Sequence, residues 1–446
     1  MMRTAQFSLV LPACILLPAL TASAQTAPAP RATVLRCARL LDVKAGKLLA
    51  DNNVVVSGNK IIAVGPAATT AVPAGATVIE LRDATCLPGL FDAHTHLVDL
   101  QDPASYDWDR PLKASAAQMA FASIPNARNT LLAGFTSVRD LGTYRAFVDL
   151  ALRDAIERGT IPGPRMQAAG AYITISGGAG ALTGYAHDVQ LPLELRFGRA
   201  DGPDQVRQRV REIVRQGAAV IKVLATGAIL TLGSQPAAQE FTYDELRAAV
   251  EEATKAGLKV AAHAHSSAGA RDAIRAGVAS IEHGTLLDDE TLLLMKDRGT
   301  FLALDLLAAW MFWPGGTPEG RPAGYPQEFL DKEKISFASQ LRVARRAREL
   351  GVKIAFATDA GVIPHGRNAV LFESYVQSGV TPLEALRTAT LHAAELLGWA
   401  DRLGSMEAGR LADIIAVRGN PLEDIRVMQK VEFVMKDGVV YKNDLR

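Results

Sequence analysis

The sequence predicts an α/β protein: a (β/α)8 barrel, or TIM barrel, with a small β-sandwich domain built from both chain ends. Three observations lead to this prediction. Short β-branched runs fill residues 33–86 and return in residues 403–446. Strand-like and helix-like segments alternate over residues 87–402, between these two regions. The chain has 446 residues, 49% hydrophobic and 21% charged, which is enough for a large barrel and a smaller domain.

The first residues have the pattern of an export signal. Arg3 supplies a positive charge, residues 7–20 are apolar, and "TASAQ" offers a small-residue cleavage site after Ala24. The apolar stretch is too short and too rich in proline to span a bilayer, which disfavours a signal anchor. We therefore expect a signal peptide over residues 1–24 and a lead-in over residues 25–32. The mature protein would be exported, either periplasmic or secreted, with no membrane attachment after signal removal.

Cleavage at that site would leave two cysteines, Cys37 and Cys86. An oxidising compartment would allow them to pair. The sequence alone does not bring them within bonding distance, so the default expectation is two buried thiols.

The β-sandwich domain is predicted from turn signals between β-branched runs. In the N-terminal part these signals stand at Gly46, at Asn52-Asn53 and at Gly58-Asn59. In the C-terminal part, Lys436-Asp437-Gly438 carries a hairpin signal. The strands expected there cover residues 413–417, 431–436 and 439–441.

The barrel is predicted from eight strand-like segments that helical patterns separate. The clearest helix starts where Thr242 and Glu245 form a capping box, and it ends at Gly257. An open doubly wound sheet is the alternative, but its phosphate-binding fingerprint is absent. The expected strands lie in residues 87–97, 135–140, 165–174, 219–225, 258–265, 279–283, 300–307 and 352–359.

Histidines gather at the ends of these strands. In a barrel of this type the active-site residues lie at the C-terminal strand ends. The fourth strand carries Lys222, and the eighth ends in Asp359. Five of the eight histidines of the chain end the first, fifth and sixth strands: His94, His96, His263, His265 and His283.

This set of side chains suits a metal centre. Imidazoles with a carboxylate are typical ligands of a divalent ion such as zinc. The set exceeds what one tetrahedral ion needs, and two ions about 3.5–4 Å apart would explain the surplus. Two histidines on a solvated loop would be the simpler explanation of His94 and His96 taken alone. A buried Lys222 could lose its proton and react with CO₂ to give a bridging carbamate, or it could pair as an ammonium with a barrel carboxylate.

The motifs resemble those of the amidohydrolase superfamily over nearly all of residues 33–446. They are "PGLFDAHTHL", "TSVRDLG", "IKVLATG", "VAAHAHS", "IEHGT" and "ATDAG". Within the superfamily the chain is similar to the imidazolonepropionase-like and Xaa-Pro dipeptidase-like group. Amidohydrolases that degrade ochratoxin A belong to this group, and the chain resembles them closely.

The resemblance implies a role for each residue. His94, His96 and Asp359 would hold the more buried zinc ion, and His263 and His283 the more exposed one. Carboxylated Lys222 would bridge the two ions. His265 would be a catalytic-site residue that faces the substrate rather than a metal.

The resemblance also implies amide hydrolysis that releases a C-terminal amino acid from a dipeptide or an N-acyl amino acid. This includes Xaa-Pro dipeptidase or carboxypeptidase activity and cleavage of ochratoxin A to ochratoxin α and phenylalanine. Asp359 would be both metal ligand and acid/base. Side chains expected to hold the substrate carboxylate are Tyr172, His187, His265 and Arg367. Relatives often read "GGHG" where residues 177–180 read "GGAG", so any role of that histidine is lost or passes to His187.

Other functions remain open at this point. A cyclic-amide hydrolase of the imidazolonepropionase type, a single-metal deaminase and a non-catalytic zinc-binding barrel are the alternatives. The net charge of +1 gives no electrostatic case for nucleic-acid binding. The aromatic, Pro/Gly-rich segment 310–329 is expected to be a lid, a pocket wall or a subunit contact, and a homo-oligomer is expected from the family.

Overall fold

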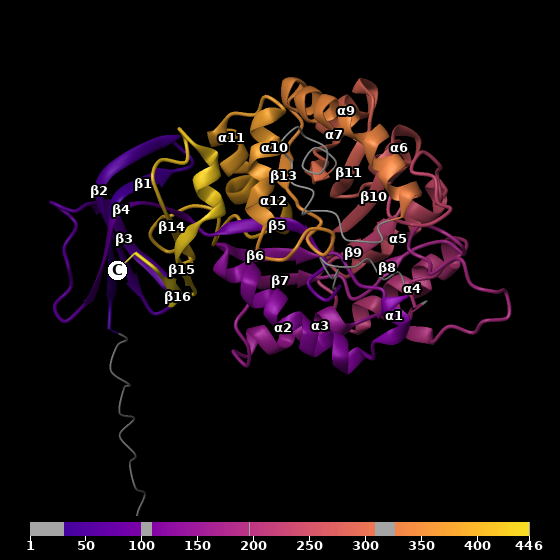
Figure 1. The fold of residues 1–446 in the computed structure, drawn as a ribbon, viewed down its shortest axis with the longest axis horizontal. Coiled ribbons are helices and arrows are strands. Elements are labelled where there is room, and N and C mark those ends of the chain that lie inside the picture. Colours follow the sequence, from indigo (N-terminus) through magenta and orange to yellow (C-terminus); the bar gives the residue numbers. More distant parts are fainter. Residues whose placement is uncertain (1–30, 100–108, 196, 308–325, 446) are drawn as a thin grey trace, which may run out of the picture.

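The computed structural model describes residues 31–99, 109–195, 197–307 and 326–445. The predicted signal peptide, most of the lead-in and most of segment 310–329 lie outside these residues. Figure 1 shows a β domain on one side and a larger barrel with an outer layer of helices on the other.

Both ends of the chain build the β domain, as predicted. Its strands form one continuous seven-stranded sheet in the order β16-β15-β14-β4-β1-β2-β3. Strand β4 connects the N-terminal and C-terminal parts of this sheet, because it pairs with β1 in parallel and with β14 in antiparallel orientation. The sheet has a hydrophobic core of its own, to which Leu35, Val54, Ile414 and Phe433 belong. The strands are β1 (Thr33–Asp42), β2 (Lys47–Ser57), β3 (Lys60–Pro66), β4 (Thr77–Pro88), β14 (Ile414–Arg418), β15 (Val431–Lys436) and β16 (Val439–Asn443).

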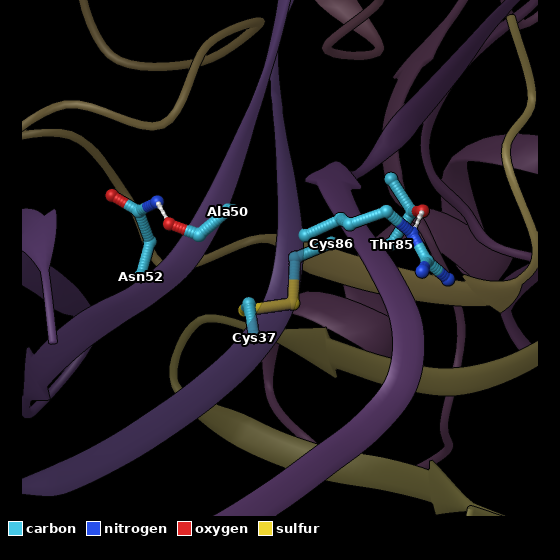
Figure 2. Close-up of a disulfide and its surroundings, with 6 residues drawn as sticks. Cys37, Ala50, Asn52, Thr85 and Cys86 are labelled. Atoms are coloured by element: carbon cyan, nitrogen blue, oxygen red, sulfur yellow. Dashed lines mark hydrogen bonds between the residues drawn. A yellow bond between two sulfur atoms is a disulfide. The ribbon is translucent and has the colours of Figure 1, made fainter.

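Cys37 of β1 and Cys86 of β4 form a disulfide, so the expectation of two buried thiols is wrong (Figure 2). Their Cα atoms are 5.9 Å apart, within the range that a disulfide can bridge. The parallel register of β1 and β4 shifts between Cys37 and Arg39. Because this irregularity decides which residues of β4 lie beside Cys37, the sequence could not reveal the pairing.

Parallel strands form the predicted barrel. The third predicted strand is split into β7 and β8, and Gly170 between them has a positive φ of 74°. Backbone hydrogen bonds close the barrel where its two sheets meet. The N–H of Asp359 donates to the carbonyl of His94 (2.9 Å), and the N–H of Ala219 donates to the carbonyl of Ala168 (2.9 Å). The strands are β5 (Leu90–Thr95), β6 (Phe135–Asp140), β7 (Arg165–Ala168), β8 (Tyr172–Ile173), β9 (Ile221–Leu224), β10 (Val260–Ser266), β11 (Ser280–Leu286), β12 (Phe301–Leu304) and β13 (Ile354–Phe356).

The helices surround the barrel strands. The predicted capping box is present at the start of α5, where Thr242 Oγ1 accepts from Glu245 N and the Glu245 side chain accepts from Thr242 N. Among the described residues, no helix has the length and hydropathy needed to cross a membrane. The α-helices are α1 (Arg110–Lys113), α2 (Ala116–Leu132), α3 (Val148–Glu157), α4 (Pro203–Arg215), α5 (Tyr243–Lys255), α6 (Ser267–Ala276), α7 (Asp289–Arg298), α9 (Gln327–Leu350), α10 (Leu371–Gln377), α11 (Pro382–Arg387) and α12 (Ala393–Leu397). Short helical turns are η1 (Leu193–Leu195), η3 (Asn368–Val370), η4 (Thr388–His392) and η5 (Ile425–Gln429).

Candidate metal centre

Five histidines in or directly after three strands meet at one end of the barrel. The ring of His283 in β11 has its centroid 4.5 Å from that of His263 and 5.0 Å from that of His265, both in β10. The ring of His94 in β5 lies 4.9 Å from that of His283 and 5.2 Å from that of His96. The carboxyl ends of the strands therefore bring together all five imidazoles that the sequence pointed to.

Asp359 joins this cluster from the end of β13. Its Oδ1 atom lies 3.2 Å from Nε2 of His96 and 3.5 Å from Nε2 of His94. One donor atom from each of the three residues lies within 4.8 Å of the others, close enough to share one ion. Burial alone would raise the pKa of Asp359, but the imidazoles of His94 and His96 hold it well below its usual range. Asp359 is therefore a carboxylate available as a ligand.

Two of these residues have a left-handed backbone. The φ angle is 68° at His283 and 54° at Asp359. A non-glycine residue in this region costs about 1–3 kcal/mol, and such residues concentrate at functional sites. The strain therefore supports a functional reason for the positions of these two side chains.

Several of these histidines make a hydrogen bond through one of their two ring nitrogens. Nδ1 of His283 donates to Oδ2 of Asp305 (2.8 Å), and Nδ1 of His96 to the carbonyl of Gly142 (2.6 Å). Nδ1 of His265 pairs with Oγ1 of Thr285 at 2.9 Å. A histidine that donates through one nitrogen keeps a lone pair on the other for a metal ion.

His94 lies beside a buried carboxylate, that of Glu282. Its Nδ1 lies 3.1 Å from Oε2 of Glu282, which is fully buried. Glu282 also accepts hydrogen bonds from Arg139 Nη2 (2.8 and 3.0 Å) and from the Ser280 hydroxyl. This network fixes the carboxylate beside His94 and compensates the buried charge of Arg139.

The imidazoles are suited to metal binding by their charge as well. Burial and the nearby ring of His283 lower the pKa of both His263 and His265 well below its usual value, which keeps these two rings neutral. His96 differs: burial opposes its protonation, but Asp359 raises its pKa to about 9. A bound cation would compete with that proton for the same Nε2 lone pair.

Lys222 of β9 extends into the same centre. The residue is 2% exposed, and its Nζ has no hydrogen-bond partner among the described residues. Burial lowers its pKa to about 8. The alternative of an ammonium paired with a barrel carboxylate is thus not observed in the described structure. A buried amine without a partner is the chemical state from which a carbamate forms.

The centre lies in a cavity of about 510 Å³. Tyr172 and His265, both predicted substrate contacts, line it, but His187 and Arg367 are exposed and are not among its lining residues. Much of the lining is apolar, and its residues include Met119, Leu224, Ile229, Leu307 and Val362. Ala179 of the "GGAG" loop and Arg110 of α1 line it too.

Sequence reasoning missed several acidic residues around the centre. Asp305 follows β12 at the same end of the barrel as the ligands, and Glu282 directly precedes His283, so their positions were available as signals. Glu333 lies on α9 and lines the cavity. Burial and the charges of Asp305 and Asp359 raise its pKa well above its usual value. No pattern in the sequence of α9 pointed to Glu333.

Comparisons with known proteins identify the family of the chain. The profile of the amidohydrolase family matches residues 85–441. Ochratoxinase of Aspergillus niger is 33% identical over 374 residues, which cover 80% of this chain and 75% of that protein. Imidazolonepropionase of Micrococcus luteus is 26% identical over 386 residues, 83% of this chain and 88% of that protein.

Solved structures are similar as well. The crystal structure of a Xaa-Pro dipeptidase with methionine bound in its active site has a TM-score of 0.85 and 36% identity, and covers 92% of this chain and 100% of that one. The structure of the A. niger ochratoxinase has a TM-score of 0.80 and 30% identity, with 93% and 96% of the two chains covered. On these grounds the chain belongs to the amidohydrolase family and is a hydrolase that acts on amide bonds.

Proposed function

We propose that the protein is a dinuclear zinc amidohydrolase that releases the C-terminal amino acid from a dipeptide or an N-acyl amino acid. The observation that carries this proposal is the buried amine of Lys222. It has no hydrogen-bond partner in the described part of the chain, and it lines the same cavity as the imidazoles and Asp359. As a carbamate it would supply the anionic oxygens that two neighbouring cations share.

The residues present fit two zinc ions. His94, His96 and Asp359 offer two imidazoles and a carboxylate to one ion, and His263 and His283 offer two imidazoles to the other. Carboxylated Lys222 would bind both. The donor types match those that zinc prefers. Histidines that bind zinc usually donate their other ring N–H to a carboxylate or carbonyl, as His283 does to Asp305.

When bound, zinc would lower the pKa of water toward neutrality and polarise an amide carbonyl. A side chain of the protein would transfer the protons. Asp359, at the end of β13, lies beside the nitrogen atoms of His94 and His96 and faces the cavity. Its carboxylate would take a proton from the attacking water and deliver it to the leaving nitrogen of the amide. His265, held through Nδ1 by Thr285, would position the substrate next to the reacting carbonyl.

The cavity lining supports this substrate class. Arg110 is a cation at the cavity wall and would pair with the carboxylate of the leaving amino acid, a role that Tyr172 and His265 could share. The apolar part of the lining, to which Met119 and Ile229 belong, would accept a bulky side chain or ring. The names of the relatives, ochratoxinase and Xaa-Pro dipeptidase, are consistent with an amide whose leaving group is an amino acid.

We also propose that the protein is exported. The signal-like residues 1–24 and the disulfide between Cys37 and Cys86 both favour an oxidising compartment. A homo-oligomer is proposed too, and the exposed side chains of Phe121 and Ile335, 74% and 73% accessible, are suitable contacts.

The proposal is tested by metal content and activity on the same preparation. We expect two zinc ions per chain by elemental analysis. We also expect release of phenylalanine, leucine or proline from N-acyl amino acids, ochratoxin A and Xaa-Pro dipeptides, lost on chelation and restored by zinc. Incubation with ¹³C-labelled bicarbonate should give a carbamate NMR signal that Lys222→Ala lacks. One ion per chain with deamination of a substrate would instead support a deaminase. Ring opening of imidazolonepropionate without cleavage of linear amides would support the cyclic-amide alternative.

A further inference from the structure

Glu333 of α9 is a buried carboxyl group that lies beside the metal centre. The residue is 1% exposed, and its Oε2 atom has no hydrogen-bond partner among the described residues. The neighbouring Lys332 does not compensate it, because Lys332 Nζ lies 3.0 Å from the carbonyl of Thr231 and 2.5 Å from Oε1 of Glu328. Nevertheless, Glu333 lines the cavity of the metal centre.

The charged groups that act on Glu333 are acidic. Asp305 and Asp359 both place negative charge near its carboxyl group. Asp305 uses Oδ2 for His283, but its Oδ1 is buried without a partner in the described structure, and the residue also lines the cavity. The cavity therefore has a region where two carboxyl groups each keep an unpaired oxygen.

Burying polar atoms without partners costs free energy, so such groups in a binding cavity indicate a ligand that satisfies them. A cation with several N–H donors would donate to both oxygens, and its positive charge would favour the ionised form of Glu333, whose pKa burial and the neighbouring acidic groups raise. A primary ammonium group has three donors and a single positive charge, which fits two acceptors and the acidic surroundings. A neutral acyl chain would leave both oxygens unsatisfied.

We propose that Glu333, with Asp305, binds the protonated α-amine of a dipeptide substrate and makes the enzyme prefer free dipeptides over N-acyl amino acids of the same shape. This assignment rests on the proposed amide hydrolysis and narrows its substrate class. Arg110, which also lines the cavity, would pair with the carboxylate of the same dipeptide, so the lining offers a partner for each charge of a zwitterion.

The test compares two substrates that differ only in the amine, leucyl-phenylalanine and isocaproyl-phenylalanine. We expect the zinc-loaded enzyme to cleave the first with the higher kcat/KM. Glu333→Gln should lower kcat/KM for leucyl-phenylalanine roughly ten- to hundredfold, the loss expected for a hydrogen bond to a charged group. The same variant should leave isocaproyl-phenylalanine unchanged or slightly improved. Asp331→Asn is the matched control. Asp331 lies on the same helix but is exposed, and the hydrogen bond of its side chain is the one that it accepts from Gln327.

A second readout needs no turnover. Ketomethylene analogues of both substrates, in which CH₂ replaces the scissile NH, are titrated into wild type and Glu333→Gln by calorimetry. The amine should tighten binding in the wild type and lose that advantage in the variant. An equal effect of Glu333→Gln on both members of the pair, or no preference for the amine in the wild type, would overturn the assignment. If neither peptide is hydrolysed, the proposed function fails, and calorimetry still decides on the amine site by itself.

Discussion

Nδ1 of His283 donates a hydrogen bond to Oδ2 of Asp305 across 2.8 Å. This contact commits one ring nitrogen and leaves the Nε2 lone pair of His283 for a metal ion. Asp305→Ala should therefore lower zinc affinity about 10- to 100-fold, the usual effect of losing such a partner. Competition with a chromogenic chelator measures the affinity. Asp305→Asn keeps an acceptor oxygen and should retain most of it. Unchanged affinity in the alanine variant would contradict this role.

Asp359→Asn tests the proposed acid/base. The amide keeps the size of the side chain but cannot accept the proton, so kcat should fall about 10²- to 10⁴-fold. Circular dichroism should show an intact fold. Elemental analysis is needed on the same sample, because a loss of metal would explain the same fall. Near wild-type turnover in a fully loaded variant would refute the role.

Glu240 gives a prediction about pH. Its carboxylate accepts from the backbone N–H of Ala179 at 2.8 and 3.0 Å, and burial raises its pKa from 4.5 to about 7. Because the folded protein binds this proton more tightly than the unfolded chain, the associated stability is present below pH 4.5 and lost as the pH rises through about 7. Glu240→Gln removes this dependence.

The size of that change is limited, because Glu240 is only partly shielded from solvent. The free energy of unfolding of the wild type should fall by about 2 kcal/mol at most, relative to Glu240→Gln, over this interval. Urea titrations at several pH values measure it. Parallel pH profiles for the two proteins would show that Glu240 is not the group responsible.

The disulfide predicts the thiol content and the stability of the β domain. A protein that begins after Ala24 should show no free thiol when denatured, because its two cysteines are paired. Replacing both by serine should lower the free energy of unfolding by about 2–4 kcal/mol, since the bond restricts the unfolded chain. Finding two reactive thiols in the denatured, unreduced protein would exclude the pairing.

The parts predictable from the sequence were those with a local or periodic signal. The strand ends carrying His94, His263 and Asp359 were found because barrel geometry brings such ends together. The helix that begins after Thr242 was found because its capping box is a local pattern. The capping box depends only on residues close in the sequence, and the strand ends depend only on the rule that parallel barrel strands end on the same side.

The missed parts depend on packing between distant segments. Arg139 and Glu282 form an ion pair although they are 143 positions apart in the sequence. Nothing in the residue types or their spacing indicates that the two side chains meet. The link between Cys37 and Cys86 depends on a register irregularity that no turn signal marks. Glu333 is one acidic residue on a long helix with many charges, and only the fold shows that this one lies inside.

The continuous sheet of the β domain also constrains how the chain can fold as it is synthesised. Thr85 of β4 bonds to the carbonyl of Gly419, 334 positions later, and β14 is the neighbour of β4 in the sheet. A nascent chain would therefore leave one edge of β4 unpaired until almost all of the polypeptide had emerged from the ribosome. The final docking of β14 and β15 would then be a late event, and C-terminal truncations would expose that edge to aggregation.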